Sequence, residues 1–156
     1  MPLEIEHKYL VRKDLWYAVQ KPPGVNVRQG YLLTGPDKTI RVRTTGTEAY
    51  LTIKGASPKA SRAEYEYPIP VADADELLKI CTVPLIEKIR YRIEYAGKTW
   101  EVDEFFGENE GLILAEIELI SEGEKYNRPS WVGEEVTGDK RYYNAYLAQH
   151  PFSGTV

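Results

Sequence analysis

The sequence predicts a mainly β protein (α+β), built as a closed eight-stranded antiparallel β-barrel with a charged lumen and a few peripheral helices. Three observations lead to this fold class. Most of the chain consists of short strand-like segments separated by turn signals. Nearly all of these segments alternate charged with apolar residues, so each strand would have one charged face. The connections between them are mostly short, which favours antiparallel neighbours and a sheet that closes on itself.

Eight strands are expected, divided by turn signals such as "KPPG", "TGPD", Gly46 and "AGK". In chain order they cover about 2–10, 25–33, 39–45, 49–55, 61–69, 86–95, 99–106 and 112–120. Helices are expected at 73–81 and 139–149, with a further short helix within 12–20. We expect these helices at the ends of the barrel or outside it.

Length and composition predict one ordinary folded domain. The chain has 156 residues, of which 42% are hydrophobic and 28% charged, and no linker divides it, so residues 1–156 are expected to form a single domain. The net charge of −4 argues against a nucleic-acid partner. No signal peptide or apolar run of about 18 residues is present, so we expect a cytoplasmic protein that does not enter a membrane. The oligomeric state stays open, a homodimer included.

The only cysteine, Cys81, excludes an intramolecular disulfide and argues against a cysteine-based zinc site. Cys81 ends the apolar-periodic stretch "ADELLKIC", and we expect it to be a small buried hydrophobe.

The charged strand faces carry unusually pure pairs. Glu4, Glu6 and Lys8 share one face of the first strand, and later strands carry Arg-x-Arg and Glu-x-Glu pairs, as in "RVR" and "EIE". A water-facing sheet alternates in the same way, which remains the simpler explanation for any single strand. Solvated faces normally mix in Ser, Thr and Gln, however. If the charged face lines a lumen, its charges need partners or a ligand, and both signs together suit a polyanion carried with a divalent metal.

These motifs occur in an order that resembles a known family. "EIEHK" at 4–8 fits the Glu-x-Glu-x-Lys signature of the CYTH superfamily, the triphosphate tunnel metalloenzymes. It is followed by "RVR", "TIK", "EYE", "EKIRYR", "EVDEF", "AEIEL" and the tail "GEEVTGDKRYYNAYL", so the likeness spans nearly the whole chain. The resemblance implies an eight-stranded tunnel that binds a triphosphate with Mg²⁺ or Mn²⁺.

The resemblance also implies roles for individual residues. Phosphate-binding cations would be Lys8, Arg41, Arg43, Lys54, Lys88 and Arg90, with Arg28 as a further substrate contact. Metal ligands would be Glu4, Glu6, Asp103, Glu116 and Glu118, with Glu64 and Glu66 nearby. Catalysis would depend on Glu4, Glu6, Lys8 and Asp103. Lys140 and Arg141 would either cap one tunnel mouth or simply face water, and His7 lies on the opposite strand face and is not expected to be a ligand.

The short strand-plus-tail plan is similar to bacterial members that hydrolyse inorganic triphosphate to diphosphate and phosphate, with nucleoside triphosphates as a side activity. Class IV adenylate cyclase and thiamine triphosphatase remain alternatives within the family. Two further alternatives are a non-catalytic module that binds polyphosphate or a nucleotide, and a scaffold whose charged faces are merely solvated. In the favoured case the partner is a small-molecule triphosphate.

Overall fold

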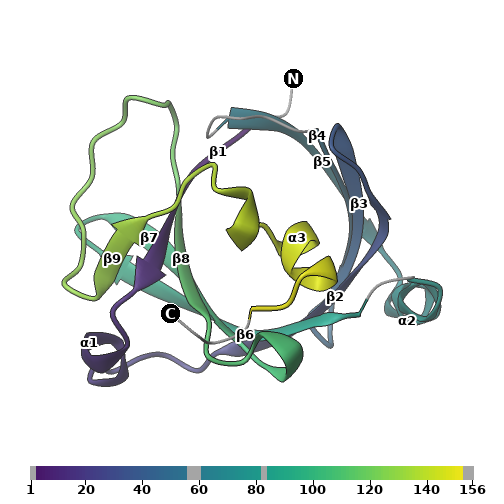
Figure 1. The fold of residues 1–156 in the computed structure, drawn as a ribbon, viewed down its shortest axis with the longest axis horizontal. Coiled ribbons are helices and arrows are strands. Elements are labelled where there is room, and N and C mark those ends of the chain that lie inside the picture. Colours follow the sequence, from purple (N-terminus) through teal and green to yellow (C-terminus); the bar gives the residue numbers. More distant parts are fainter. Residues whose placement is uncertain (1–2, 56–60, 82–83, 153–156) are drawn as a thin grey trace.

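The computed structural model describes residues 3–55, 61–81 and 84–152, and in these ranges it shows one antiparallel sheet of nine strands (Figure 1). The strands are β1 (Leu3–Val11), β2 (Val25–Thr34), β3 (Lys38–Thr44), β4 (Ala49–Gly55), β5 (Ser61–Ile69), β6 (Ile86–Tyr95), β7 (Lys98–Phe105), β8 (Ile113–Glu118) and β9 (Val132–Glu135). The helices are α1 (Lys13–Tyr17), α2 (Val71–Lys79) and α3 (Asn144–Gln149), with 3₁₀ turns η1 (Gly107–Asn109) and η2 (Lys140–Tyr142).

The strand order makes the sheet curl around a lumen. It runs β5-β4-β3-β2-β6-β7-β8-β1-β9, and a short antiparallel ladder between β1 and β5, from Leu3↔Ala63 to Ile5↔Ser61, joins the two ends of the eight-strand series. Strands β1–β8 therefore form a ring, as Figure 1 shows. The predicted mainly β antiparallel fold is confirmed. A ninth strand, β9, was not predicted, and it is only four residues long.

The hairpin between β6 and β7 shows how local sequence fixes the register. Ala96 has φ 49° and Gly97 has φ 79°. Two successive positive φ values are typical of the type I′ turn, whose twist matches that of an antiparallel strand pair. The pairing of Tyr95 with Lys98 then places Arg90 opposite Asp103, and this pair becomes central to the site.

The apolar strand faces point outward, so the main hydrophobic cores lie outside the ring. On one side, Trp16, Trp100 and Trp131 pack together with ring centroids 5.0–6.0 Å apart. Trp16 comes from α1 and is fully buried, and its indole Nε1 donates a hydrogen bond of 2.7 Å to Glu104. Covering the outer face in this way leaves the inner face free to be charged.

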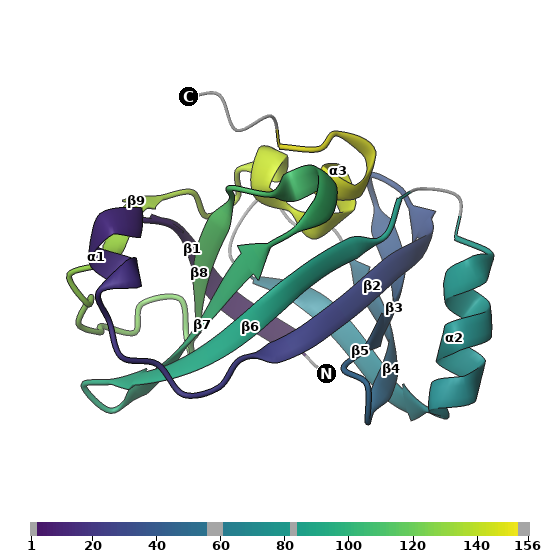
Figure 2. The same ribbon diagram turned by 90° about the horizontal axis from the view of Figure 1, so that it is seen from below.

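Helix α2 covers the outer face on the opposite side of the ring (Figures 1 and 2). Its residues Ala74 and Leu78, one helical turn apart, pack with Val42 of β3 in a second core. The helix was predicted at 73–81 and forms at 71–79. Cys81 lies just after it and is half-buried rather than fully buried.

The C-terminal segment lies across one end of the ring (Figure 2). A single helix was predicted over 139–149, but η2 and α3 are separated by Tyr143, whose backbone is extended with φ −75° and ψ 138°. Leu147 and Ala148 of α3 pack with Tyr31 and Phe105 in a third core at this end. Within the described residues, no helix is long and apolar enough to cross a membrane.

Candidate functional site

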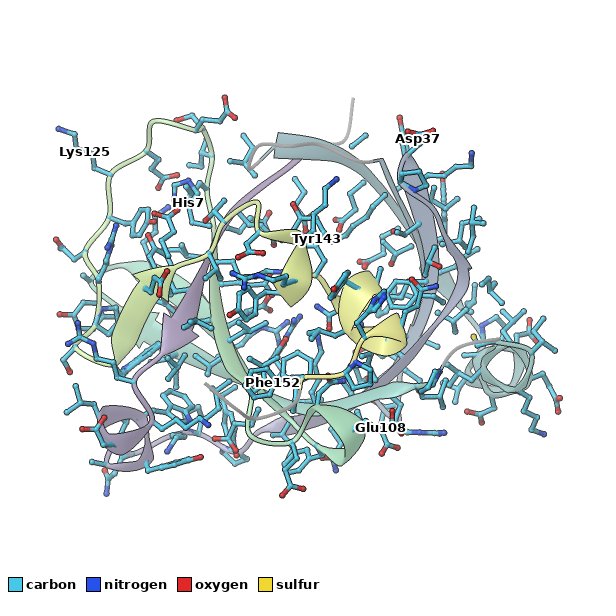
Figure 3. All side chains as sticks on the ribbon, viewed as in Figure 1. His7, Asp37, Glu108, Lys125, Tyr143 and Phe152 are labelled. Atoms are coloured by element: carbon cyan, nitrogen blue, oxygen red, sulfur yellow. The ribbon has the colours of Figure 1, made fainter. Side chains whose placement is uncertain are left out.

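The charged strand faces converge on one cavity of about 240 Å³ inside the ring. The predicted site residues that line it are Glu4, Glu6, Lys8, Arg41, Arg43, Lys54, Glu64, Glu66, Arg90, Glu116 and Glu118. Figure 3 shows Tyr143 within the ring and His7 beyond its wall. The prediction that the charges face the lumen and the isoleucines and valines face outward therefore agrees with the structure.

Three cations gather where the C-terminal segment covers the ring, and we call this the covered end: Lys8, Arg43 and Lys88. Lys8 Nζ donates to the Tyr142 carbonyl at 3.2 Å and lies 5.1 Å from the centre of the Tyr143 ring. Lys88 Nζ donates to Asn144 Oδ1 at 3.1 Å. These lysines are 5% and 2% exposed, so the covering segment supplies neutral acceptors to cations that have little contact with water.

The wall of the cavity beside the covered end holds a tightly paired group. Arg90 donates two hydrogen bonds to the Asp103 carboxylate, at 2.7 and 2.8 Å, and Lys88 contacts the same carboxylate at 2.9 Å. Burial alone would raise the pKa of Asp103, but the charges of Arg90 and Lys88 hold it well below its usual range. Glu116 is also buried, yet Lys8 and Arg90 lower its pKa to about 2. The negative charges of both residues are matched by neighbouring cations.

The other end of the cavity has an excess of carboxylates, and we call it the acidic end: Glu4, Glu6, Glu64 and Glu118. Its cation Lys54 contacts Glu4 at 2.9 Å and Glu64 at 3.4 Å. Burial, Glu116 and Glu4 together raise the pKa of Glu6 to about 8. The pKa values of Glu64 and Glu118 are raised as well, in both cases chiefly by burial and then by Glu4.

The covered end shows the opposite electrostatic imbalance. Burial lowers the pKa of Lys88 to about 7, against the favourable charge of Asp103. Burial, Arg41 and Arg90 lower the pKa of Arg43. The pKa values at both ends thus shift toward the neutral form, chiefly because burial disfavours charge, and repulsion between like charges adds to this effect.

Comparison with known proteins identifies the family. Residues 2–143 match the CYTH domain family. This chain belongs to that family. Two curated relatives are similar over nearly the full length of this CYTH chain. It is 50% identical to an inorganic triphosphatase of Acetivibrio thermocellus over 97% of both chains, and 39% identical to one of Nitrosomonas europaea over 93% of this chain and 96% of the relative.

Solved structures of CYTH-like tunnels have the same fold. The crystal structure of an inorganic triphosphatase superposes with a TM-score of 0.66 at 35% identity, covering 100% of this chain and 97% of that one. A conserved hypothetical protein from Pyrococcus furiosus has a TM-score of 0.58 at 22% identity, over 77% of this chain and 80% of that chain, and supports the fold alone.

The acidic end of this CYTH protein fits a hard divalent cation. Its donors are carboxylate oxygens, the ligands that Mg²⁺ and Ca²⁺ prefer. The pKa of Glu6 is raised first by burial and then by Glu116 and Glu4, and a bound cation would offset both effects. Among the described residues, no three acidic or histidine side chains are already close enough together to hold an ion. A cation bound here would therefore be held by one or two carboxylates together with water and phosphate oxygens, as is usual for Mg²⁺.

Three predicted site residues lie elsewhere than expected: Arg28, Asp103 and Lys88, which is 2% exposed and does not line the cavity. Arg28 is on the outer face of β2, about half exposed, with Nε 3.5 Å from Glu87, so the expected substrate contact is not supported. Asp103 lies behind the cavity wall, 2% exposed, with its oxygens used by Arg90 and Lys88 rather than open to the lumen. Lys140 and Arg141 were expected either to cap a tunnel mouth or to face water. Both are exposed, and Arg141 is paired with Asp139 at 2.7 Å.

His7 is outside the ring, as predicted, where its Nδ1 lies 2.6 Å from the Tyr126 hydroxyl.

Several cavity residues were not among those predicted to have a role in the site. They are Tyr31, Thr39, Thr52, Arg92, Glu101, Tyr143, Asn144 and Ala145, with Gln29 buried beside them. The sequence did indicate Arg92, Thr52 and Glu101, because each lies two residues from a predicted site residue and so on the same face of its strand. Asn144 had no such signal, since its position depends on how the C-terminal segment folds over the ring.

Proposed function

We propose that this CYTH protein hydrolyses inorganic triphosphate to diphosphate and orthophosphate with the help of Mg²⁺ or Mn²⁺, as a single cytoplasmic domain spanning residues 1–156. One observation carries the proposal: the cavity gathers carboxylates at one end and cations at the other, and at both ends burial and repulsion between like charges shift pKa values toward the neutral form. A triphosphate carried with a divalent cation supplies the opposite charge at each end. The names of the two curated relatives support the same substrate.

The cations that line the cavity, together with Lys88 buried beside them, would bind the triphosphate oxygens: Lys8, Arg41, Arg43, Lys54, Lys88 and Arg90. Arginine suits two-point contact with phosphate, whereas lysine acts as a mobile point charge. Lys8 and Lys88 hold neutral partners of the covering segment, which phosphate oxygens can replace without separating an ion pair. We expect these contacts to fix the triphosphate along the tunnel axis and to neutralise charge that develops on the leaving diphosphate.

The carboxylates would hold the cation and the water. When bound, the divalent cation supplies charge neutralisation and a more acidic water molecule. Glu4, Glu6, Glu116 and Glu118 are the proposed oxygen ligands, and Glu4 and Glu6 are also placed to orient the water. We assign Asp103 to positioning, because its carboxylate fixes Arg90 and Lys88 at 2.7 and 2.9 Å.

The lining of the cavity favours inorganic triphosphate over a nucleotide or thiamine ester. Tyr31 and Tyr143 are its only aromatic side chains among the described residues, and Tyr143 already stacks beneath Lys8. No apolar slot for a base or a thiazole ring is formed by the described residues that line the cavity. Nucleotide turnover is therefore expected only as a minor activity.

One assay separates the proposed function from its alternatives. The protein is incubated with tripolyphosphate and Mg²⁺, and orthophosphate release and ligand binding are measured together. The proposal predicts equal amounts of orthophosphate and diphosphate, and none with chelator. Binding without release would indicate a polyphosphate-binding module, and neither binding nor release would indicate a sheet whose charged face has no ligand.

A further inference from the structure

A buried glutamine links the cations of the covered end. Gln29 of β2 is 0% exposed. Its Oε1 accepts a hydrogen bond from Arg43 Nε at 3.1 Å, and its Nε2 donates to Asn144 Oδ1 at 3.2 Å and to the Tyr31 hydroxyl at 3.4 Å. Asn144 Oδ1 also accepts from Lys88 Nζ at 3.1 Å. An uninterrupted chain of hydrogen bonds thus joins Arg43 to Lys88 through two neutral amides.

The two cations fix the direction of every bond in this chain. Arginine and protonated lysine side chains can only donate. The amide oxygen of Gln29 must therefore face Arg43, and the amide oxygen of Asn144 must face Lys88. That leaves the NH₂ group of Gln29 to meet the Asn144 oxygen, and the structure shows this contact. Glutamate at position 29 would place an acceptor against an acceptor here, and a hydrophobic residue would leave both neighbours unpaired.

A neutral partner holds Arg43 without cancelling its charge. Among the described residues, no carboxylate lies within ion-pair distance of Arg43, and its nearest fixed partner is the amide of Gln29. Arg90, in contrast, is bound by the Asp103 carboxylate. A guanidinium held by an amide keeps its full positive charge for an incoming anion and is still oriented.

We propose that Gln29 is a positioning residue for triphosphate binding: it aims Arg43 into the tunnel and couples it, through Asn144, to Lys88 and to the C-terminal covering segment. This inference rests on the proposed function. Gln29 does not itself line the cavity, so it would act on the substrate only through Arg43 and Asn144.

The test uses Gln29→Met, which keeps the length and unbranched shape of the side chain but removes its hydrogen bonds. Asn26→Met, exposed on the same strand, is the matched control. Tripolyphosphate affinity is measured by titration calorimetry with chelator present, and KM and kcat are measured with Mg²⁺. We expect Gln29→Met to raise Kd and KM about tenfold, the scale of a hydrogen bond to a charged group. The value of kcat should stay within about threefold, as for lost uniform binding, and Asn26→Met should match the wild type.

A double-mutant comparison separates positioning from simple packing. In an Arg43→Ala background, adding Gln29→Met should change Kd by less than about twofold, because its main route to the substrate is gone. Should Gln29→Met fail to fold, Gln29→Glu keeps the shape and must also weaken affinity, since it neutralises Arg43 and opposes Asn144. Unchanged affinity in Gln29→Met, or a full additional loss in the Arg43→Ala background, overturns the inference.

These outcomes are distinct from failure of the proposed function. A wild-type protein that binds tripolyphosphate but releases no phosphate overturns the hydrolytic function, and the calorimetric comparison still decides the role of Gln29. A wild-type protein that does not bind tripolyphosphate overturns both.

Discussion

The acidic end and the covered end of the tunnel gather charges of opposite sign on the same strands. On β1, Glu4 belongs to one end and Lys8 to the other, and they are separated by only four residues, or roughly 13 Å along an extended strand. At the acidic end, burial and repulsion among carboxylates raise the pKa of Glu6 to about 8. At the covered end, burial lowers the pKa of Lys88 to about 7.

This difference shows that the tunnel is not a set of mutually satisfied ion pairs. In the wall of the tunnel beside the covered end the charges are nearly all paired, since Asp103 is held by Arg90 and Lys88. At the two ends they are not, and charged groups held in a low-dielectric site without enough counter-charge cost stability. Such an arrangement is typical of a binding site whose ligand completes the charge balance.

The largest effect is expected from removing a charge at the acidic end. Glu118→Gln keeps the shape of the side chain but removes one anionic oxygen donor. We expect turnover of tripolyphosphate to fall by about two orders of magnitude or more, the scale of a lost electrostatic element, and chelator to abolish wild-type turnover. Phosphate release under saturating Mg²⁺ measures both effects.

Glu122→Gln is the matched control for this prediction. Glu122 is exposed in the segment between β8 and β9, and its variant should keep wild-type turnover. Full Mg²⁺-dependent activity in Glu118→Gln would show that the cation is held without this carboxylate.

The raised pKa of Glu6 predicts how metal binding depends on pH. Below about pH 8 the folded protein holds a proton on Glu6, and a divalent cation must displace it. Affinity for Mn²⁺, measured by calorimetry without triphosphate, should therefore rise up to tenfold per pH unit from pH 6 and level off near pH 8. Affinity that is flat across this range would mean that the carboxylates of the acidic end do not hold the cation.

The same shift has a consequence for stability. The folded state retains a proton that the unfolded chain has lost above its ordinary pKa of 4.5, so raising the pH from 4.5 to about 8 should lower the free energy of unfolding of the metal-free protein. The Glu6→Gln variant should show a smaller fall in melting temperature over this range. An equal fall in both proteins would assign the effect to other groups.

At the covered end, Arg43→Ala should reduce the stabilisation that triphosphate provides. Ligand at ~100 times its Kd should stabilise the wild type by ~2.7 kcal/mol, which is a rise of several degrees in melting temperature for a domain of this size. The variant should show a clearly smaller rise at the same ligand concentration, and its free form should melt no lower than the wild type because repulsion with Arg41 and Arg90 is relieved. An undiminished rise would place the triphosphate elsewhere.

The smallest effect is expected on the outer face. Arg28→Ala removes a cation that is about half exposed and paired with Glu87. Tripolyphosphate turnover should stay within about twofold of the wild type, in kcat and in KM. A tenfold increase in KM would show that the outer face of β2 contributes to substrate binding.

Strand alternation was sufficient to predict most of the lumen. It assigned Glu4, Glu6 and Lys8 to one face of β1, and it separated Arg41 and Arg43 from Val42. It succeeded because these strands have one charged and one apolar face, so only one orientation covers the apolar face with helices and loops.

Alternation did not decide the orientation of β2, where both faces carry polar residues, and Arg28 was expected at the site from the family resemblance. Arg28 shares its face with Gly30, and a Cβ at Gly30 would lie 2.7 Å from Cys81 Sγ. That face therefore packs close beneath the end of α2, and Gln29 takes the inner face. Glycine inside a strand signals such a close approach, so Gly30 could have indicated that Arg28 points outward.

The covered end could not be predicted from periodicity. The contacts of Lys8 with Tyr142, and of Lys88 with Asn144, join residues more than fifty positions apart. They exist because Tyr143 breaks the expected helix and turns the chain across the ring. The position of Asp103 behind the wall likewise depends on how Arg90 and Lys88 compete for it, which strand pattern alone does not encode.

The most direct test of the two-ended tunnel is a crystal structure with Mn²⁺ and a methylene-bridged triphosphate analogue, which resists hydrolysis. Anomalous scattering from manganese gives the position of the cation independently of the triphosphate. The account predicts manganese bound by carboxylates of the acidic end, with phosphate oxygens on Lys8, Arg43 and Lys88 in place of the Tyr142 carbonyl and the Asn144 amide. Manganese or triphosphate bound outside the ring, with the charges of the lumen left paired among themselves, would contradict it.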